Sequence, residues 1–132
     1  MVILDACVLI AHANIHHPDH EKSLAILSQP VSFIVNELTL AEYLVKPAQL
    51  GIDIEIEADA VLREINARRA KHYWLTENES WDVRVAKVRA ETGLKMPDAV
   101  VYATAVALGC KVAAFDGELA NVARDNGLLF AP

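Results

Sequence analysis

Apolar residues follow two patterns along this chain, and the patterns alternate from one end to the other. Short unbroken runs of aliphatic, β-branched and aromatic residues are typical of strands that are buried on both faces. Such runs predict strands at Val2–Leu4, Phe33–Val35, Tyr73–Leu75, Lys111–Phe115 and Leu128–Phe130.

Between these runs, apolar residues recur with the spacing of an amphipathic helix, and capping residues, prolines and glycines mark the ends. We predict helices at Val8–Ala13, from Asp19 to a stop at Pro30, from a cap at Asn36 or Thr39 to a stop at Pro47, at Ile52–Arg69, from a cap at Thr76 or Asn78 to Thr92, at Pro97–Leu108 and at Gly117–Asn126.

The alternation of strands and helices, with no hairpin signal between strands, predicts right-handed crossovers and a mainly parallel sheet. We therefore expect a three-layer α/β/α fold with about five strands, in one domain that covers residues 1–132. In such folds ligands bind at the carboxyl ends of the strands, where the strand order reverses.

Four acidic residues lie where apolar elements begin or end. Asp5 and Asp116 follow predicted strands, while Glu42 and Asp98 lie on predicted helices. Taken singly, each could be a helix cap, a first-turn anion or a solvent-facing side chain. Together they predict one carboxylate cluster, because several like charges beside an apolar core are costly unless a cation compensates them. Oxygen ligands suit Mg²⁺, and we expect Mn²⁺ to substitute.

The net charge of −6 argues against binding nucleic acid through bulk charge alone. Positive residues nevertheless concentrate in the middle of the chain, either as solvated helix faces or as a phosphate-facing rim beside the acidic cluster. They are Arg63, Arg68, Arg69, Lys71, Arg84, Lys87, Arg89 and Lys95.

The longest apolar run, Ala99 to Cys110, is too short to span a bilayer, and no basic-then-apolar leader precedes a cleavage site. We therefore expect a cytoplasmic protein without a membrane segment. Cys7 and Cys110 have no metal-binding spacing and are interpreted as free thiols.

A histidine cluster offers another metal site. His12, His16, His17 and His20 are spaced at close to one helical turn, which is a possible zinc arrangement. Pro18 interrupts the helix that such a site requires, so we do not include zinc in the prediction.

Four segments, DACVLIA, NELTLAEYL, LKMPDAVVYATA and AAFDGELANVA, occur in this order, and with them the chain resembles the PIN-domain family, most closely its bacterial VapC-type toxins. The resemblance extends from Met1 to nearly Pro132. It implies a parallel sheet flanked by helices, an acidic site for Mg²⁺ or Mn²⁺, and endoribonuclease activity on RNA that a cognate antitoxin restrains. By position, the family's acidic residues, which are its catalytic and metal-binding residues, match Asp5, Glu42, Asp98 and Asp116.

The resemblance also implies interaction partners. An antitoxin arginine is expected to pair with the acidic cluster and displace the metal. A toxin homodimer is expected to cover apolar surface such as Leu38, Leu40 or Tyr43.

Two positions depart from the family pattern. Cys7 stands where many relatives have Ser, Thr or Asn, and Ala114 stands where they have Thr or Ser. These hydroxyl or amide groups usually support the acidic site, so their absence bears on metal affinity or rate.

Three other functions were compared with the sequence, and two of them require acidic residues that this chain lacks. A haloacid dehalogenase-like phosphatase requires a second acid two residues after Asp5, where this chain has Cys7. A receiver-type signalling domain requires an acidic pair, but Asp5 is followed by Ala6. A catalytically silent PIN-like interaction module is consistent with the departures at Cys7 and Ala114. Metal-dependent cleavage of RNA distinguishes all three from the expected nuclease.

Overall fold

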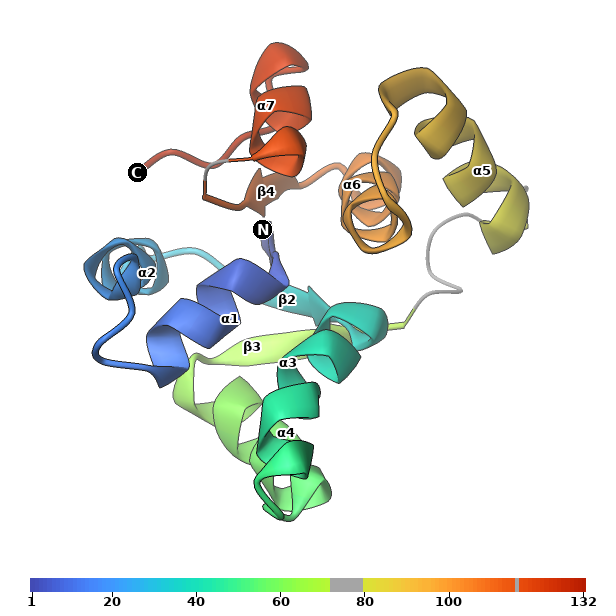
Figure 1. Cartoon of the computed structure of the whole chain (residues 1–132). Helices are drawn as coiled ribbons and strands as arrows, with labels where there is room; N and C mark the ends of the chain where they lie inside the picture. The colour runs from blue at the N-terminus through green and yellow to red at the C-terminus, as the bar shows by residue number, and fades with distance from the viewer. Residues whose placement is uncertain (72–79, 116) are drawn as a thin grey trace.

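The computed structural model describes residues 1–71, 80–115 and 117–132. Within these ranges the chain alternates short strands with helices (Figure 1). In order, the elements are β1 Val2–Leu4, α1 Ala6–Ala13, α2 His20–Leu27, β2 Phe33–Asn36, α3 Glu37–Gln49, α4 Ile54–Glu64, β3 Ala67–Ala70, α5 Trp81–Thr92, α6 Met96–Leu108, β4 Lys111–Ala113 and α7 Glu118–Asp125.

The described strands form one parallel sheet in the order β3-β2-β1-β4. β1 lies in the middle and pairs with β2 through Ile3 and Ile34 and with β4 through Leu4 and Ala113. The chain moves to one side of β1 for β2 and β3 and to the other side for β4. The strand order therefore reverses at β1, and ligands bind at such a point in open α/β sheets.

Helices cover both faces of the sheet. Ile3, Ile34 and Val112 pack on one face with residues of α5, α6 and α7. Leu4 and Val35, their neighbours along the strands, pack on the other face with residues of α1, α2, α3 and α4. Side chains alternate along a strand, so almost every residue of β1 and β2 is buried whichever face it points to. The predicted three-layer α/β/α fold is confirmed.

The predicted helix at Ile52–Arg69 is wrong over its last part. α4 ends at Glu64, and Asn66 has a left-handed backbone with φ 54°. Asn is one of the few residues that adopts this conformation at low cost, so the chain turns there and enters β3. Pairing with β2 then places Ala67–Ala70 in the sheet, which overrides their helical spacing.

Pro47 was expected to end the preceding helix, but α3 continues to Gln49. Proline removes one backbone donor, and here it lies in the last turn, where the loss affects a single hydrogen bond. The backbone N–H groups of Leu50 and Ile52 donate to the Pro47 carbonyl and close the helix end. At the other end, the Asn36 side chain accepts a hydrogen bond from the Leu38 N–H, so Asn36 rather than Thr39 is the cap.

Other predicted boundaries are wrong by about two residues: α1 begins at Ala6 rather than Val8, and β4 ends at Ala113 rather than Phe115. Gly93 and Gly109 end α5 and α6 in the left-handed conformation that favours glycine. Leu128–Phe130 contributes one parallel bridge, from Leu129 to Val112, instead of a full fifth strand. The strand predicted at Tyr73–Leu75 and the caps Thr76 and Asn78 lie outside the described residues. None of the helices that the structure describes is long and apolar enough to cross a membrane.

Candidate active site

Asp5 lies at the carboxyl end of β1, at the point where the strand order reverses. Its backbone is extended, with φ −79° and ψ 158°, and its N–H donates to the Ala113 carbonyl of β4 at 3.0 Å. Asp5 stands at the N-cap position of α1, but its carboxylate makes no capping hydrogen bond. The cap explanation therefore does not account for this side chain, which is free to face charges on neighbouring elements.

Glu42 on α3 and Asp98 in the first turn of α6 face Asp5. Burial raises the pKa of Glu42, and the charges of Asp5 and Asp98 raise it further. Burial also raises the pKa of Asp98, with additional contributions from Asp5 and Glu118, while Lys95 acts in the opposite direction. The charges of Asp5 and Asp98 both act on Glu42, and the charge of Asp5 acts on Asp98, so the fold brings together three of the four predicted site residues from three separate elements.

The three carboxylates form an open cluster rather than a closed cage. Among the residues that the structure describes, no group of three or more His, Cys, Asp or Glu side chains is spaced to hold a metal ion. Mg²⁺ takes only one or two protein carboxylates and keeps several waters, so it does not require such a cage. An all-oxygen cluster whose members repel one another fits a hard divalent cation.

The fourth predicted residue, Asp116, lies outside the described residues. Glu118 is an acidic residue of this region that sequence reasoning missed. It lies in the first turn of α7, and its charge raises the pKa of Asp98. Its separation from Asp116 by a single glycine was a signal that could have identified it, because both acids follow the predicted strand Lys111–Phe115 in the sequence.

Cys7 supports Asp5 directly. Its thiol donates a hydrogen bond to the Asp5 carboxylate and accepts one from the backbone N–H of Phe115. Burial, and then the Asp5 charge, raise the pKa of the Cys7 thiol, so it stays a neutral donor. A thiol therefore provides the contact that a hydroxyl or amide was expected to provide. Ala114 has no polar side chain and packs against the core.

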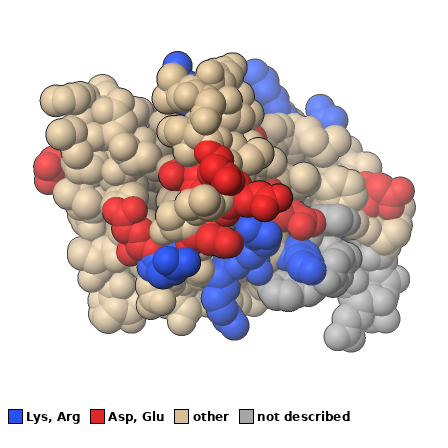
Figure 2. Space-filling view, turned by 90° about the horizontal axis from the view of Figure 1, so that it is seen from below, with Lys and Arg blue, Asp and Glu red and all other residues tan. Residues whose placement is uncertain are grey.

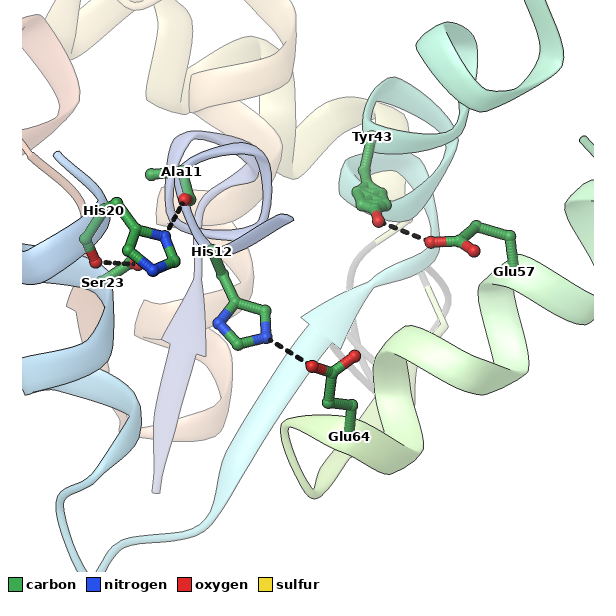
Figure 3. A network of polar contacts seen from close by, with 7 residues as sticks. All are labelled: Ala11, His12, His20, Ser23, Tyr43, Glu57 and Glu64. Atoms are coloured by element: carbon green, nitrogen blue, oxygen red, sulfur yellow. Dashed lines mark hydrogen bonds and ion pairs between the residues drawn. The ribbon is translucent and has the colours of Figure 1, made fainter. Parts of the chain in front are cut away.

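The histidines connect helices (Figure 3). His12 on α1 contacts Glu64 on α4, with 3.3 Å between Nε2 and Oε1. The Nδ1 atom of His20 on α2 is 2.8 Å from the carbonyl oxygen of Ala11, and the His17 ring accepts a hydrogen bond from the Asp19 N–H. The contacts of His12 and His20 give these two side chains a role in helix packing.

Figure 2 shows how charged side chains are distributed on one face of the molecule. Asp and Glu side chains form a band there, and Lys and Arg side chains lie directly beside it. At the acidic cluster itself, Lys95 is exposed and close enough to Asp98 to affect its pKa. The negative net charge therefore does not prevent positive groups from lying beside the carboxylates.

The apolar surface expected for a homodimer is largely buried within the fold. Leu40 and Tyr43 are only 3% and 6% exposed and belong to the core between α3 and the sheet, so their expected role as surface is wrong. Leu38 is 37% exposed. The helical spacing of this segment did not show which of its apolar residues face the sheet.

A groove of about 380 Å³ lies between α1, α3 and α4. At its base the Tyr43 hydroxyl donates to Glu57 at 2.7 Å and joins α3 to α4 (Figure 3). Its rim is apolar and exposed, with Leu50 64%, Ile52 47% and Ile10 45% accessible. The remaining lining residues are Ala13, Asn14, Lys46 and Pro47.

The repulsion within the cluster predicts a pH-dependent stability of the metal-free protein. Burial and the charges of Asp5 and Asp98 raise the pKa of Glu42 in the folded state, so the ionised Glu42 carboxylate lowers the free energy of unfolding. This loss of stability is absent below the unfolded pKa of about 4.3 and fully present above the raised value. We expect Glu42→Gln to gain stability relative to wild type as the pH rises through this window. Urea unfolding in chelator, from about pH 4 to about pH 8, measures the difference.

Glu91→Gln removes an exposed glutamate on α5 and is the matched control. A constant difference between Glu42→Gln and wild type at every pH would show that the Glu42 charge does not oppose folding.

Comparison with known proteins is consistent with this architecture. A family model described as PIN domain matches residues 2–125. Among solved structures, VapC20 of Mycobacterium tuberculosis, described as a sarcin–ricin loop cleaving toxin, superimposes with a TM-score of 0.68 at 17% sequence identity, covering 92% of this chain and 95% of that one.

Two further structures have a similar fold. A toxin–antitoxin complex from Klebsiella pneumoniae has a TM-score of 0.64 at 19% identity, covering 88% of this chain and 87% of that one. VapBC2 from Rickettsia felis, bound to a DNA fragment from its promoter, has a TM-score of 0.61 at 12% identity, covering 88% and 89%. No curated protein matches this chain.

Proposed function

The chain belongs to the PIN domain family, and on this premise we propose that it is a metal-dependent endoribonuclease and the toxin of a toxin–antitoxin pair. The observation that carries the proposal is the convergence of Asp5, Glu42 and Asp98 at the carboxyl edge of the sheet. The Asp5 carboxylate makes no capping hydrogen bond, and burial together with neighbouring acidic charges raises the pKa of Glu42 and of Asp98, so the cluster opposes folding unless a cation neutralises it.

Asp5 and Asp98 would be the principal ligands of Mg²⁺ or Mn²⁺, with Glu42 and Asp116 completing the site. When bound, a divalent cation activates water and neutralises charge on the phosphoryl oxygens. The Cys7 thiol, which lies beside the Asp5 carboxylate, would help to orient it toward the cation.

Hydrolysis requires a group that accepts a proton from the attacking water. The pKa values of Glu42 and Asp98 are both raised, and the Glu42 side chain is the more accessible of the two, so we assign this role to Glu42. The water oxygen then bonds to phosphorus, the bond from phosphorus to the leaving ribose oxygen breaks, and that oxygen takes up a proton. Lys95, beside Asp98, is placed to contact an adjacent phosphate.

An antitoxin partner is part of the proposal, because two of the similar structures are toxin–antitoxin assemblies. The apolar groove fits the nonpolar face of a partner segment. Lys46 of the groove and Glu42 of the cluster lie one turn apart on α3, about 6 Å along the helix axis. One short segment could therefore fill the groove and place an arginine against the carboxylates.

A homodimer in the cytoplasm is the remaining part of the proposal, and its interface would have to exclude the buried Leu40 and Tyr43. A silent PIN-like module is the competing function, since Ala114 provides no polar support. Placement in the PIN family leaves the phosphatase and receiver alternatives without support.

Incubation with RNA tests the proposed activity. A sarcin–ricin loop oligonucleotide and an unstructured RNA are suitable probes, because the M. tuberculosis relative is described as cleaving the first. We expect cleavage of RNA with Mg²⁺ or Mn²⁺ and none in chelator. Equal cleavage with and without chelator would contradict the metal-dependent mechanism, and no cleavage of any RNA would favour the silent module.

A further inference from the structure

Two fully buried polar side chains join the helices that carry Glu42 and Asp98. Asn36 and Thr104 are both 0% exposed, although each has polar atoms that must be satisfied. The Asn36 Nδ2 donates to the Thr104 hydroxyl at 3.2 Å, and that hydroxyl donates to the Val100 carbonyl at 2.7 Å. The contact links the start of α3 to the middle of α6.

The orientation of this pair is fixed by its other partners. The Asn36 Oδ1 accepts from the Leu38 N–H at 2.8 Å, so the other amide atom must be the donor that faces Thr104. The Thr104 proton is directed to the Val100 carbonyl, which leaves its oxygen free to accept. The Asn36 amide orientation and the Thr104 hydroxyl direction are therefore both set by hydrogen bonds to the backbone.

The same number of residues separates the hydrogen-bonding residue from the carboxylate on each of the two helices. Glu42 follows Asn36 by six residues, and Asp98 precedes Thr104 by six. Since Asn36 contacts Thr104 and Glu42 interacts electrostatically with Asp98, α3 and α6 pack antiparallel with these two contacts about 9 Å apart. A slide of one helix along the other would change both contacts together.

We propose that the Asn36–Thr104 hydrogen bond is a positioning device that sets the separation of the Glu42 and Asp98 carboxylates for metal binding. The Asp98 charge acts unfavourably on Glu42, which favours a wider separation of α3 and α6, and the buried hydrogen bond between Asn36 and Thr104 holds the two helices together. The inference rests on the proposed metal-dependent function. It assigns positioning roles to two residues that contact neither the metal nor the RNA.

The variant Thr104→Val keeps the side-chain volume and removes the hydroxyl. We expect it to raise the Mn²⁺ concentration for half-saturation by about tenfold, because residues that orient ligands typically change metal affinity by 10- to 100-fold. Thr104→Ser keeps the hydroxyl and should bind Mn²⁺ like wild type. Electron paramagnetic resonance of free Mn²⁺ measures the binding directly, independently of RNA cleavage.

Two further variants make the test decisive. Asn36→Ser keeps an oxygen that can cap α3, but its side chain is too short to reach Thr104. Thr104→Val leaves the buried Asn36 amide without its acceptor and can fold poorly for that reason, whereas Asn36→Ser removes the amide itself. It should weaken Mn²⁺ binding in the same way. Ser23→Ala is the matched control, since Ser23 is also a fully buried hydroxyl, but it bonds to the His20 carbonyl on α2.

The outcomes separate the two claims. Weaker Mn²⁺ binding in Thr104→Val and Asn36→Ser, with wild-type binding in Thr104→Ser and Ser23→Ala, supports the positioning role. Unchanged Mn²⁺ binding in a Thr104→Val protein that melts at a lower temperature overturns it and leaves a purely structural role. Absence of Mn²⁺ binding by wild type overturns the proposed metal-dependent function, and with it the inference.

Discussion

Replacement of Asp98 by Asn is expected to lower metal-dependent RNA cleavage by about 100-fold or more, because a metal ligand contributes several kcal/mol of transition-state stabilisation. Asp98 interacts with Asp5, Glu42 and Glu118, so it is the carboxylate most closely connected to the rest of the cluster. Asp5→Asn should have the same effect. Initial rates over a range of Mg²⁺ concentrations measure the loss.

The stability of the same variant distinguishes a functional carboxylate from a structural one. Asp98→Asn removes repulsion from its acidic neighbours but also a favourable first-turn charge on α6, which is worth about 0.3–1 kcal/mol. In chelator we expect the unfolding free energy to be unchanged or to rise by at most about 1 kcal/mol, since Asp98 is half-buried and partly screened.

Added metal should reverse the order of stability. A cation that binds only the native state stabilises wild type by about 2.7 kcal/mol at 100 times its dissociation constant, and the variant should gain less. Asp59→Asn, which changes an exposed acid on α4, is the control for the loss of one charge. If Asp98→Asn melts well below wild type in chelator, Asp98 holds the start of α6 and is not primarily a ligand.

A second large effect is expected from the groove between α1, α3 and α4. The double variant Leu50→Asp and Ile52→Asp should weaken binding of the proposed antitoxin by about 100-fold, because each change places a charge at an apolar residue of the proposed interface. Both side chains are about half exposed or more, so the fold and the rate of RNA cleavage should change little. Titration calorimetry with the purified antitoxin measures the affinity.

Val83→Asp is the matched control for this prediction. Val83 is 43% exposed on α5, which packs on the other face of the sheet from the groove. It should leave antitoxin binding at the wild-type level. Equal affinity for the double variant and wild type would remove the groove as the docking surface, and the proposed nuclease activity would not be affected by that result.

The sequence determined the elements whose signals are local. Buried apolar runs identified β1 and β2, and the glycines at the ends of α5 and α6 located these ends, because a left-handed residue is needed there. The alternation of strands and helices was enough to predict a parallel three-layer fold. The acidic residues where apolar elements begin or end predicted a carboxylate cluster, of which the structure brings together Asp5, Glu42 and Asp98.

Tertiary structure decided the features that depend on partners distant in the sequence. Ala67–Ala70 has helical spacing but forms β3, because β2 offers an open edge with backbone donors and acceptors. Leu40 and Tyr43 are core residues because α3 turns that face toward the sheet. Helical spacing gives the period of a pattern, and packing alone determines which face is buried.

The same distinction applies to the site. The sequence supplied the carboxylates, but their mutual interaction depends on α3 and α6 packing antiparallel at the end of β1. The sequence left open what Cys7 does at the position where many relatives have a hydroxyl or amide, and only the structure places its thiol beside the Asp5 carboxylate. The sequence specifies the residue types, whereas the pKa and the orientation of each group depend on residues that become its neighbours only in the folded structure.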